Sequence, residues 1–488
     1  MKRQFIALLA LLIVQSACQD VVEQDIIGER TTDTYWNNQA DLDDALAGTY
    51  SPFATRALGM HDLFFDNQGD DHWRAGDHEE DTQIELFNTT TTNYKLEDTY
   101  KYKYEVINNA NNIIAYGPQV LEAGNIDQEA YDNILGQAYF LRAYAYYRLF
   151  VIHGRVPIIT EENVLDLEFN IPKCETTTEL TNFILRDLDQ AAGLLPLRND
   201  AGKVNQGAAW ALMVKTYMHR AQQYDDVDNL NRAISAGEQV IANYALAEDY
   251  LSLFRSGNEN LEENLFLMMN DMSWINERLM SKHRGPRPWG MYGFQEPLDD
   301  LVNEYEEGDL RKAVTIVSDG DTVNKGGEQV VHSSELSNTG HSYFKYMDWI
   351  DPGTFNHGLN IPFLRAAETY LLVAEAKIRL NGAGAGDAEI NAVRSRAGLA
   401  TVSNADIYAL AHESRVELAG ENCRYQNLLR WDKAGVYDLT EFLSRPEKMY
   451  YADESFKIWE RPRNYYQPLY QGDIDNSNGV LEQYQAWN

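Results

Sequence analysis

The chain has 488 residues, of which 44% are hydrophobic and 11% aromatic, so it is long enough to bury a sizeable core in one large domain or two closely packed halves. Its 75 acidic and 41 basic residues give a net charge of −34, which argues against nucleic acid as a partner. Two of its three cysteines, Cys174 and Cys423, have no zinc-ligand or CxxC spacing and are expected either as isolated buried thiols or as a pair.

The first 17 residues have the pattern of an export signal. Two basic residues precede ten apolar residues (5–14), and Ser16 and Ala17 supply the small side chains that a signal peptidase requires. A helix of ten residues rises about 15 Å, roughly half the thickness of the bilayer core. The segment 1–17 is therefore predicted to be a signal peptide and not a permanent membrane span.

Cys18 follows this small pair directly. The segment resembles the lipobox of bacterial lipoproteins, in which such a cysteine becomes the acylated N-terminus, although Gln15 stands where Leu is usual. The resemblance implies that Cys18 is a lipid attachment site and that 18–32 forms a tether to the membrane. The alternative is an ordinary secretory signal with a chance cysteine.

Four stretches carry apolar residues at three- and four-residue intervals, which predicts amphipathic helices. They are 33–50, 127–150, 206–221 and 366–380. Asp33 or Thr34 is expected to cap the first helix, and the second is expected to end near Gly154. The mixture of Ala with Tyr or Leu is typical of tetratricopeptide helices, but the spacing between the stretches is irregular. The composition and pattern therefore predict a mostly α fold.

Three stretches rich in Gly, Pro and Asp interrupt this helical pattern and predict loops. They are 66–81, 281–293 and 346–358, and each carries one tryptophan of special interest: Trp73, Trp289 and Trp349. Core packing explains a tryptophan in polar, glycine-rich surroundings poorly, so these three are candidates for a binding surface. The tryptophans in helical patterns are expected in the core: Trp36, Trp210 and Trp431.

The common catalytic motifs are absent from the sequence, which has no HExxH, no Walker phosphate loop and no GxSxG elbow. The glycine-rich stretch 381–388 lacks the GxGxxG spacing and predicts a turn between helices capped by Asp387. His72 and His78 lie among carboxylates, a set that calcium or zinc can use, but acidic runs usually belong to solvated loops. We expect no enzyme activity, no cofactor and no metal.

The C-terminal half carries the most specific pattern, in the blocks 361–382, 388–399 and 412–431. In the last block, carboxylates recur four residues apart with arginines between them: Glu413, Glu417, Glu421, Arg415, Arg424 and Arg430. Helical spacing lets such acids and bases form a partly buried ion-pair network, in which an unpaired member would be costly. This block is therefore predicted to be architectural.

These blocks are similar to the C-terminal hallmark of the SusD/RagB family of Bacteroidetes outer-membrane lipoproteins. Further blocks resemble the family in the same order along the chain: 35–51, 100–114, 140–160, 301–313 and 465–485. Tyr100 stands where the family more often has Trp. Nearly the whole chain is covered, so the chain is identified as a member, with an N-terminal helical half (33–255) packed against a C-terminal half (256–488).

The resemblance implies tetratricopeptide-like helix pairs with a loop-rich ligand-binding face. It also implies a lipid-anchored protein at the cell surface that captures an oligosaccharide and delivers it to a partner SusC-like TonB-dependent transporter in the outer membrane. Two alternatives stay open. One is a peptide-capturing lipoprotein of the same fold, and the other is a glycoside hydrolase, which is disfavoured because no carboxylate pair can be chosen among 75 acids.

A glycan ligand suits the loop tryptophans, because the C–H face of a pyranose packs on an aromatic ring while polar side chains bind the hydroxyl rim. The expected ligand-binding residues are Trp73, Trp289, Trp349, Tyr292, Arg74 and Asp71. The alternative is that the tryptophans only anchor their loops. A basic cluster lies in the same region and suits sulfate or uronate groups on an anionic glycan: Lys282, His283, Arg284 and Arg287. The alternatives for this cluster are phosphate binding and pairing with acidic loops.

Overall fold

The computed structural model describes residues 35–54, 65–74, 78–166, 168–270, 280–356, 358–447 and 455–487. The predicted signal peptide, Cys18 and the tether 18–32 lie outside these residues. None of the helices in the described ranges is both long and apolar enough to cross a bilayer.

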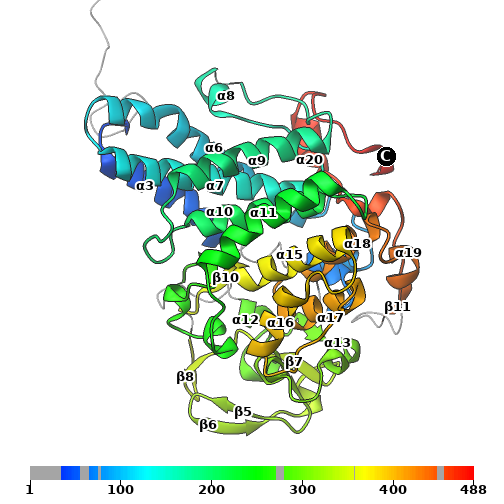
Figure 1. The fold of residues 1–488 in the computed structure, drawn as a ribbon. Helices are drawn as coiled ribbons and strands as arrows, with labels where there is room; N and C mark the ends of the chain where they lie inside the picture. The colour runs from blue at the N-terminus through cyan, green and yellow to red at the C-terminus, as the bar shows by residue number, and fades with distance from the viewer. Residues whose placement is uncertain are drawn as a thin grey trace, which may run out of the picture.

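The fold is mostly α, as predicted, and its long helices stack in two groups (Figure 1). The first group consists of α3 (Gln39–Tyr50), α6 (Tyr94–Glu122), α7 (Gln128–His153), α9 (Thr177–Leu194), α10 (Gln206–Arg220) and α11 (Val227–Asn243). The second consists of α15 (Ala366–Asn381), α16 (Asp387–Arg396), α17 (Ile407–Leu418) and α18 (Arg424–Lys433). Helix α15 packs on α10 and α11 and so joins the two groups.

Side-chain caps fix where several helices begin. Asp127 accepts a hydrogen bond from Ala130 N at the start of α7, which ends at Gly154 in a positive-φ conformation, as predicted. Helix α3 begins at Gln39, where the Asn38 side chain caps it, and the predicted cap residues Asp33 and Thr34 lie outside the described residues. The turn at 381–388 joins two helices as predicted, but Asp387 lies inside α16 and accepts from Asn404 N and Ala405 N.

The main hydrophobic core lies between the helices of the first group and extends to the strand that leads into α15. Trp36 is buried there and stacks on Tyr116, with ring centroids 5.5 Å apart. Trp431 is fully buried in a second cluster under α18, whereas Trp210 is half-buried against the main core. Cys174 and Cys423 are both buried and free, which settles the question of their pairing.

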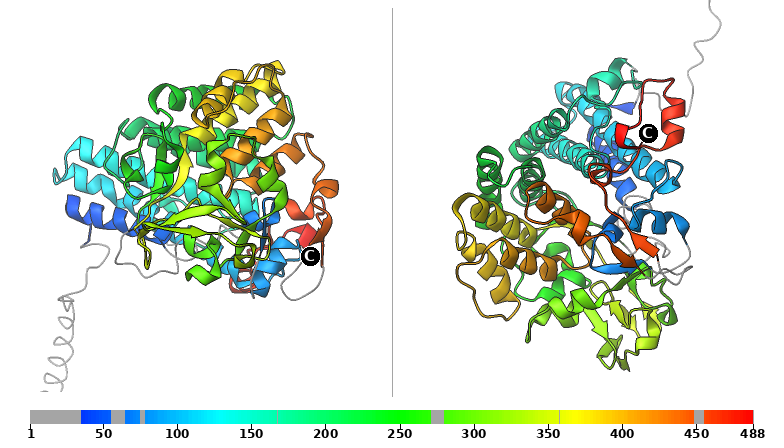
Figure 2. Two further views of the ribbon diagram at one scale, coloured as in Figure 1. Left: turned by 90° about the horizontal axis from the view of Figure 1, so that it is seen from below. Right: turned by 90° about the vertical axis from the view of Figure 1, so that its right-hand side faces the viewer.

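Short strands pair two by two, always antiparallel. The pairs are β1 (His72–Arg74) with β3 (Gln295–Pro297), β2 (Asn264–Met268) with β10 (Ile361–Arg365), β4 (Ile316–Ser318) with β7 (His341–Tyr343), β5 (Thr322–Lys325) with β6 (Glu328–Val331), β8 (Trp349–Asp351) with β9 (Thr354–Phe355), and β11 (Arg445–Glu447) with β12 (Ser455–Lys457). In the right-hand view of Figure 2 the yellow-green ribbons lie at the lower end, below the helices.

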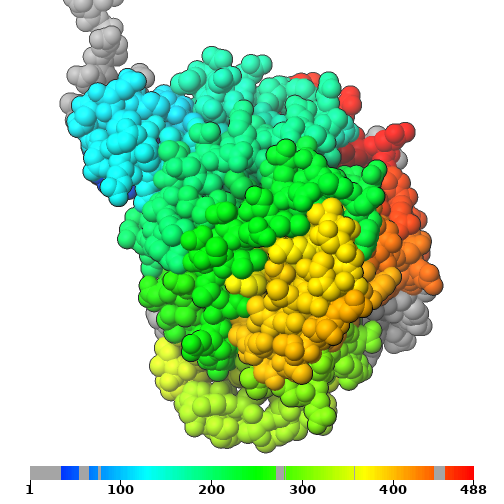
Figure 3. All heavy atoms as spheres, in the orientation of Figure 1, coloured from blue at the N-terminus to red at the C-terminus, as the bar shows by residue number. Residues whose placement is uncertain are grey.

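The remaining helical elements are short. They are α5 (Glu79–Glu85), α8 (Glu161–Asp166), α12 (Met280–Arg284), α13 (Asp299–Glu304), α14 (Leu310–Thr315), α19 (Leu439–Phe442) and α20 (Gln471–Asn476). Several of them, with the ribbons β4 to β9, make up the irregular end of the molecule, which we call the tip (280–356). In the space-filling view this yellow-green part forms the lower end (Figure 3).

A buried ion-pair network connects the second helix group with this tip. Glu417 on α17 pairs with Arg365, Arg311 and Arg396, and all four side chains are buried. The predicted network is therefore confirmed as buried, but the arginines of 412–431 turn to other partners: Arg415 to Asp71, Arg424 to Asp70 and Arg430 to Glu375.

Candidate functional site

The first of the three loop tryptophans is not at the surface. Trp73 lies in β1, where it faces Glu296 of β3 across the ladder, and only 4% of its surface is exposed. Arg74 is equally buried, in an ion pair with Asp81, and Asp71 accepts from Arg415 Nε at 2.8 Å. The prediction that these residues line a ligand surface is corrected, because all three side chains are buried and the charges of Arg74 and Asp71 are paired inside the protein.

The other two loop tryptophans come together. Trp289 and Trp349 meet edge to face, with ring centroids 5.8 Å apart and an interplanar angle of 78°. Both are half-buried, and both pack on a small cluster beneath them that includes Phe344 and Phe355. Segments that are distant in the sequence thus build one surface, which we call the aromatic face (Trp289, Trp349 and the ammonium of Lys325).

Local structure explains how each tryptophan reaches this face. Trp289 ends a short 3-10 helix, in which its N–H donates to Pro286 O at 3.0 Å and Gly290 follows with a φ of 83°. Only glycine adopts this conformation without strain, and it turns the chain back at that point. Trp349 begins β8, where its ring lies 5.4 Å from that of Phe355 on the paired strand β9.

Tyr292 follows Trp289 on the same segment. Its ring stacks on Phe294 at 5.3 Å, and Lys282 Nζ lies 5.5 Å above it. Lys282 also donates to Gly290 O at 2.9 Å, and Arg287 Nε donates to Tyr292 O at 2.8 Å. Tyr292 is half-buried, so its predicted ligand role stays a prediction.

The predicted basic cluster divides into exposed and buried members. Arg284 is buried, donating to Gln295 Oε1 at 2.7 Å and to Asn422 Oδ1 at 2.8 Å, and His283 is buried beside it. Lys282 is half-buried and Arg287 is exposed. Only these last two retain the surface position that binding an anionic glycan requires.

Sequence reasoning missed Lys325, whose Nζ lies 5.9 Å from the ring centroids of both Trp289 and Trp349. The residue sits at the end of β5, in a hairpin with no local motif to single it out. Only the packing of that hairpin against β8 brings it to the aromatic face. A contact map, and not a sequence pattern, is needed to find it.

One cluster of possible metal ligands occurs among the described residues: Glu306, His412 and Glu413. The Arg394 guanidinium already bonds both carboxylates, and His412 Nδ1 lies 2.7 Å from Glu304 Oε1. The hydrogen bond to Glu304 raises the pKa of His412 above its ordinary value. The protein's own cations therefore balance these carboxylates, which makes the cluster an ion-pair group.

His72, in the other candidate metal stretch, lies in a buried contact with Tyr343 and Asn67. Burial, with the nearby Arg284 and Lys457, lowers the pKa of His72 well below its ordinary value. Its two ring nitrogens face Tyr343 Oη at 3.2 Å and Asn67 Oδ1 at 3.0 Å, so neither is directed at a group of carboxylates.

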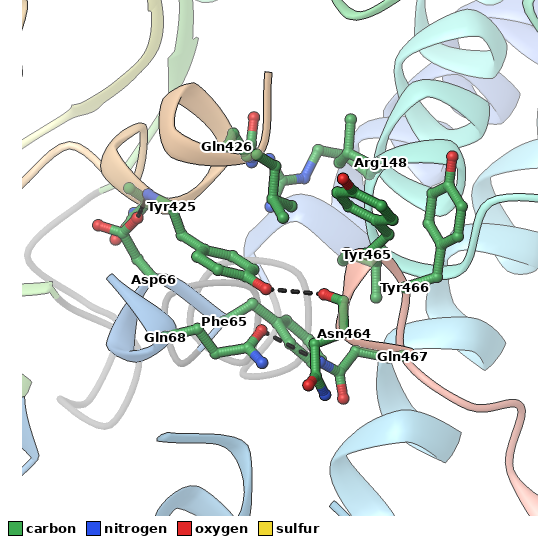
Figure 4. A pocket seen from close by; sticks show the side chains of 14 residues that line it. Phe65, Asp66, Gln68, Arg148, Tyr425, Gln426, Asn464, Tyr465, Tyr466 and Gln467 are labelled. Carbon is green, nitrogen blue, oxygen red and sulfur yellow. Dashed lines mark hydrogen bonds between the residues drawn. The ribbon is translucent and has the colours of Figure 1, made fainter. Parts of the chain in front are cut away.

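A hollow between α7, α18 and 464–467 is lined by polar and aromatic side chains (Figure 4). Its volume is about 20 Å³, enough for one or two water molecules but not for a sugar ring. Tyr425 Oη donates to Asn464 O at 2.8 Å and Gln467 Nε2 to Gln68 Oε1 at 3.0 Å across it. This hollow is a hydrogen-bonded junction between chain segments, not a glycan site.

Cavities large enough for a ligand occur elsewhere in the described part of the chain. One of about 350 Å³ lies between α6 and α20 and is lined by Tyr100, Tyr104 and Phe169; one of about 720 Å³ lies beside α3 and β2. Neither includes a residue of the aromatic face. The aromatic face is thus separate from these two cavities.

Comparison with known proteins places this architecture in a family. A model described as the SusD family matches residues 208–487, and a second, described as starch-binding associating with outer membrane, matches residues 22–218. A SusD-like protein of Formosa agariphila is 24% identical over 497 residues, covering 88% of this chain and 90% of that protein. Because the first model spans more than half of the chain, the chain belongs to the SusD family.

Solved structures share the fold. A SusD-like protein from Bacteroides fragilis superposes with a TM-score of 0.77 at 19% identity, covering 93% of this chain and 98% of that one. Surface glycan-binding protein A from Bacteroides thetaiotaomicron, solved in complex with laminarihexaose, superposes with a TM-score of 0.73 at 21% identity, covering 92% and 99%. The expectation of a SusD-like helical fold is confirmed.

Proposed function

We propose that this protein binds an oligosaccharide or polysaccharide on its aromatic face and leaves it uncut. The observation that carries this proposal is the edge-to-face meeting of Trp289 and Trp349 at the irregular tip. A half-buried indole is held firmly from beneath while part of its surface remains available for a pyranose to stack on. The laminarihexaose complex of a protein with the same fold supports a glycan as the ligand class.

The same proposal includes a lipid anchor in the outer membrane and a transporter as the partner protein. The pattern of 1–17, with Cys18 after it, supports export and lipidation, and the match to a family described as associating with the outer membrane supports that location. We propose that the bound glycan passes to a SusC-like TonB-dependent transporter. In this arrangement the helical halves 33–255 and 256–488 form the scaffold, and the tip presents the glycan.

Calorimetry on the purified chain 19–488 tests the binding step. Trp289→Ala and Trp349→Ala should each weaken binding to the tightest glycan of a panel about fivefold to tenfold, because a stacking contact contributes about 1 kcal/mol beyond area burial. The double variant should nearly abolish binding. Trp487→Ala is a matched control, since Trp487 is also half-buried but lies near the C-terminus against Arg463.

The alternatives give different outcomes in the same experiments. New reducing ends after long incubation would indicate a glycoside hydrolase. Binding of peptides but not of any glycan would indicate the peptide-capturing alternative. Full glycan affinity in a folded Trp289→Ala/Trp349→Ala variant would show that the ligand surface lies elsewhere, and the cavity lined by Tyr100 and Tyr104 would then be examined next.

A further inference from the structure

The ammonium of Lys325 lies beside both tryptophans of the aromatic face, 5.9 Å from each ring centroid. This distance is close to the outer limit of cation–π attraction, about 6 Å, so the rings hold the ammonium weakly. Within the described part of the chain, no carboxylate forms an ion pair with Lys325. In a protein of net charge −34, a lysine at the surface without an acidic partner is notable.

The nearest acidic residues along the two hairpins do not neutralise it. Glu328 faces Lys325 across the β5–β6 ladder but makes no ion pair with it within the described residues. Asp351, on the neighbouring β8–β9 turn, uses its Oδ1 to accept from Gly353 N at 2.9 Å, which stabilises its own turn. The ammonium therefore keeps its charge available at the face.

The glycine turn that follows Lys325 fixes the position of this residue. Gly326 and Gly327 both have positive φ, and Gly327 N donates to Asn324 Oδ1 at 2.7 Å. A Cβ on Gly326 would lie 2.2 Å from the Asp351 carbonyl carbon, so the two turns touch backbone to backbone. This close approach fixes the position of Lys325 relative to Trp349.

Two further cations border the same face. Lys282 Nζ makes one hydrogen bond, to Gly290 O, which leaves donors on its ammonium for a ligand. Arg287 is exposed and is held by its Nε bond to Tyr292 O. Lys325 thus lies beside the two tryptophans, and Lys282 and Arg287 lie on the segment that carries Trp289, although the chain as a whole is acidic.

We infer that the aromatic face selects a glycan that carries an anionic group, a uronate carboxylate or a sulfate, and that Lys325 binds this group while Trp289 and Trp349 stack on the sugar rings. The inference rests on the proposed function, because it names the ligand class of that face. A charge-assisted hydrogen bond from an ammonium is stronger than a neutral one. Repulsion between the net negative charge of the protein and an anionic glycan is screened beyond about 8 Å at physiological salt. The cations near the aromatic face therefore determine the local electrostatic attraction of the ligand.

Calorimetry of the chain 19–488 with three probes tests this inference: laminarihexaose as a neutral glycan, oligogalacturonate for carboxylates and a sulfated oligosaccharide for sulfate. Unmodified protein should bind one acidic probe more tightly than laminarihexaose, and Lys325→Gln should weaken that binding about tenfold. Lys325→Arg should retain most of the affinity. Binding of laminarihexaose should weaken by a smaller factor than binding of the acidic probe in Lys325→Gln, because a neutral glycan loses only a neutral hydrogen bond.

Lys101→Gln is the matched control, because Lys101 is an exposed lysine 5.7 Å above a single aromatic ring, that of Tyr102 on α6. It removes the same charge on a different element, away from both tryptophan-bearing segments in the sequence, and should leave all three affinities unchanged. The same acidic affinity in Lys325→Gln as in unmodified protein would overturn the inference, and so would a preference for laminarihexaose. If Trp349→Ala still weakens the binding of laminarihexaose in that case, the proposed function stands without the inference. If Trp349→Ala weakens the binding of none of the three probes, the proposed function fails.

Discussion

Replacing Glu417 by Gln should destabilise the protein strongly, because this carboxylate balances three buried guanidinium groups. Its oxygens lie 3.1 Å from Arg311 Nη1 and 3.0 Å from Arg365 Nη2, and a third contact comes from Arg396 Nη2. The Glu417 side chain is fully buried. Burial alone would raise its pKa, but Arg396, Arg365 and Arg311 lower the pKa of Glu417 well below its ordinary value.

The size of the effect follows from what the substitution leaves behind. Glutamine keeps the shape of the side chain and one carbonyl acceptor but removes the negative charge that the three arginines share. Each arginine keeps another carboxylate partner, such as Asp309 or Glu263, but the buried network loses one of its charges. Removing one partner of a buried pair costs about 3–5 kcal/mol. Urea unfolding followed by circular dichroism should show a lower midpoint for Glu417→Gln with an unchanged slope, since the slope reports the surface exposed on unfolding.

Glu262→Gln is the matched control for this experiment. Glu262 also pairs with an arginine, Arg198, at 3.0 Å, but both side chains are about half exposed. Water and salt screen such a pair, and its loss should cost less than about 1 kcal/mol. Equal losses of unfolding free energy in the two variants would refute the argument that burial gives the network its importance.

Three other predictions concern burial, lipidation and fold. Burial, with the nearby charge of Asp71, raises the pKa of Asp66 to about 6. The ionised carboxylate therefore lowers the free energy of unfolding at higher pH, and this loss of stability disappears as the pH falls through that pKa toward the ordinary value. Asp66→Asn keeps an oxygen for Tyr425 N and should stabilise the protein by about 3 kcal/mol at pH 8 but much less at pH 4; equal shifts of melting temperature at both would contradict this. Cys18→Ala should abolish incorporation of a labelled fatty acid and release the protein from the membrane fraction, and continued labelling would exclude Cys18 as the attachment site. Far-ultraviolet circular dichroism should be dominated by helix, and a β-type spectrum would contradict the fold.

The helical scaffold could be predicted because its signals are local. The three- and four-residue periodicity of 127–150 places α7 within a few residues, and the Asp127 cap and Gly154 mark its two ends. The buried network of 412–431 could also be anticipated, since acids and bases at helical spacing lie close enough to pair. Its actual partners could not, because Arg311 and Arg365 come from segments far away in the sequence.

The candidate site was only partly predictable, for a reason that Trp73 illustrates. Its neighbours are strongly polar, which locally indicates an exposed loop. Those neighbours are buried because each charge finds a partner: Asp70 binds Arg424, and Asp71 binds Arg415. Polarity in sequence therefore does not indicate exposure where distant arginines supply the counter-charge. Lys325 was missed for the same reason, since its position depends on a contact between two hairpins.

The ion-pair network also positions the aromatic face. Lys345, which lies between β7 and the start of β8, donates to Ala419 O at 2.8 Å and to Glu421 Oε1 at 2.6 Å. Two-stranded ribbons are marginally stable by themselves, so the tip depends on such attachments to the helices. Lys345 Nζ also donates to the backbone O of Glu417 at 3.2 Å. These three hydrogen bonds attach the segment that carries Trp349 to the end of α17 and the residues after it. If a variant of this network loses both stability and glycan affinity, displacement of the tryptophans therefore explains the loss of affinity. Lys325 lies outside the network, so a loss of affinity in Lys325→Gln at unchanged stability indicates a lost contact with the ligand.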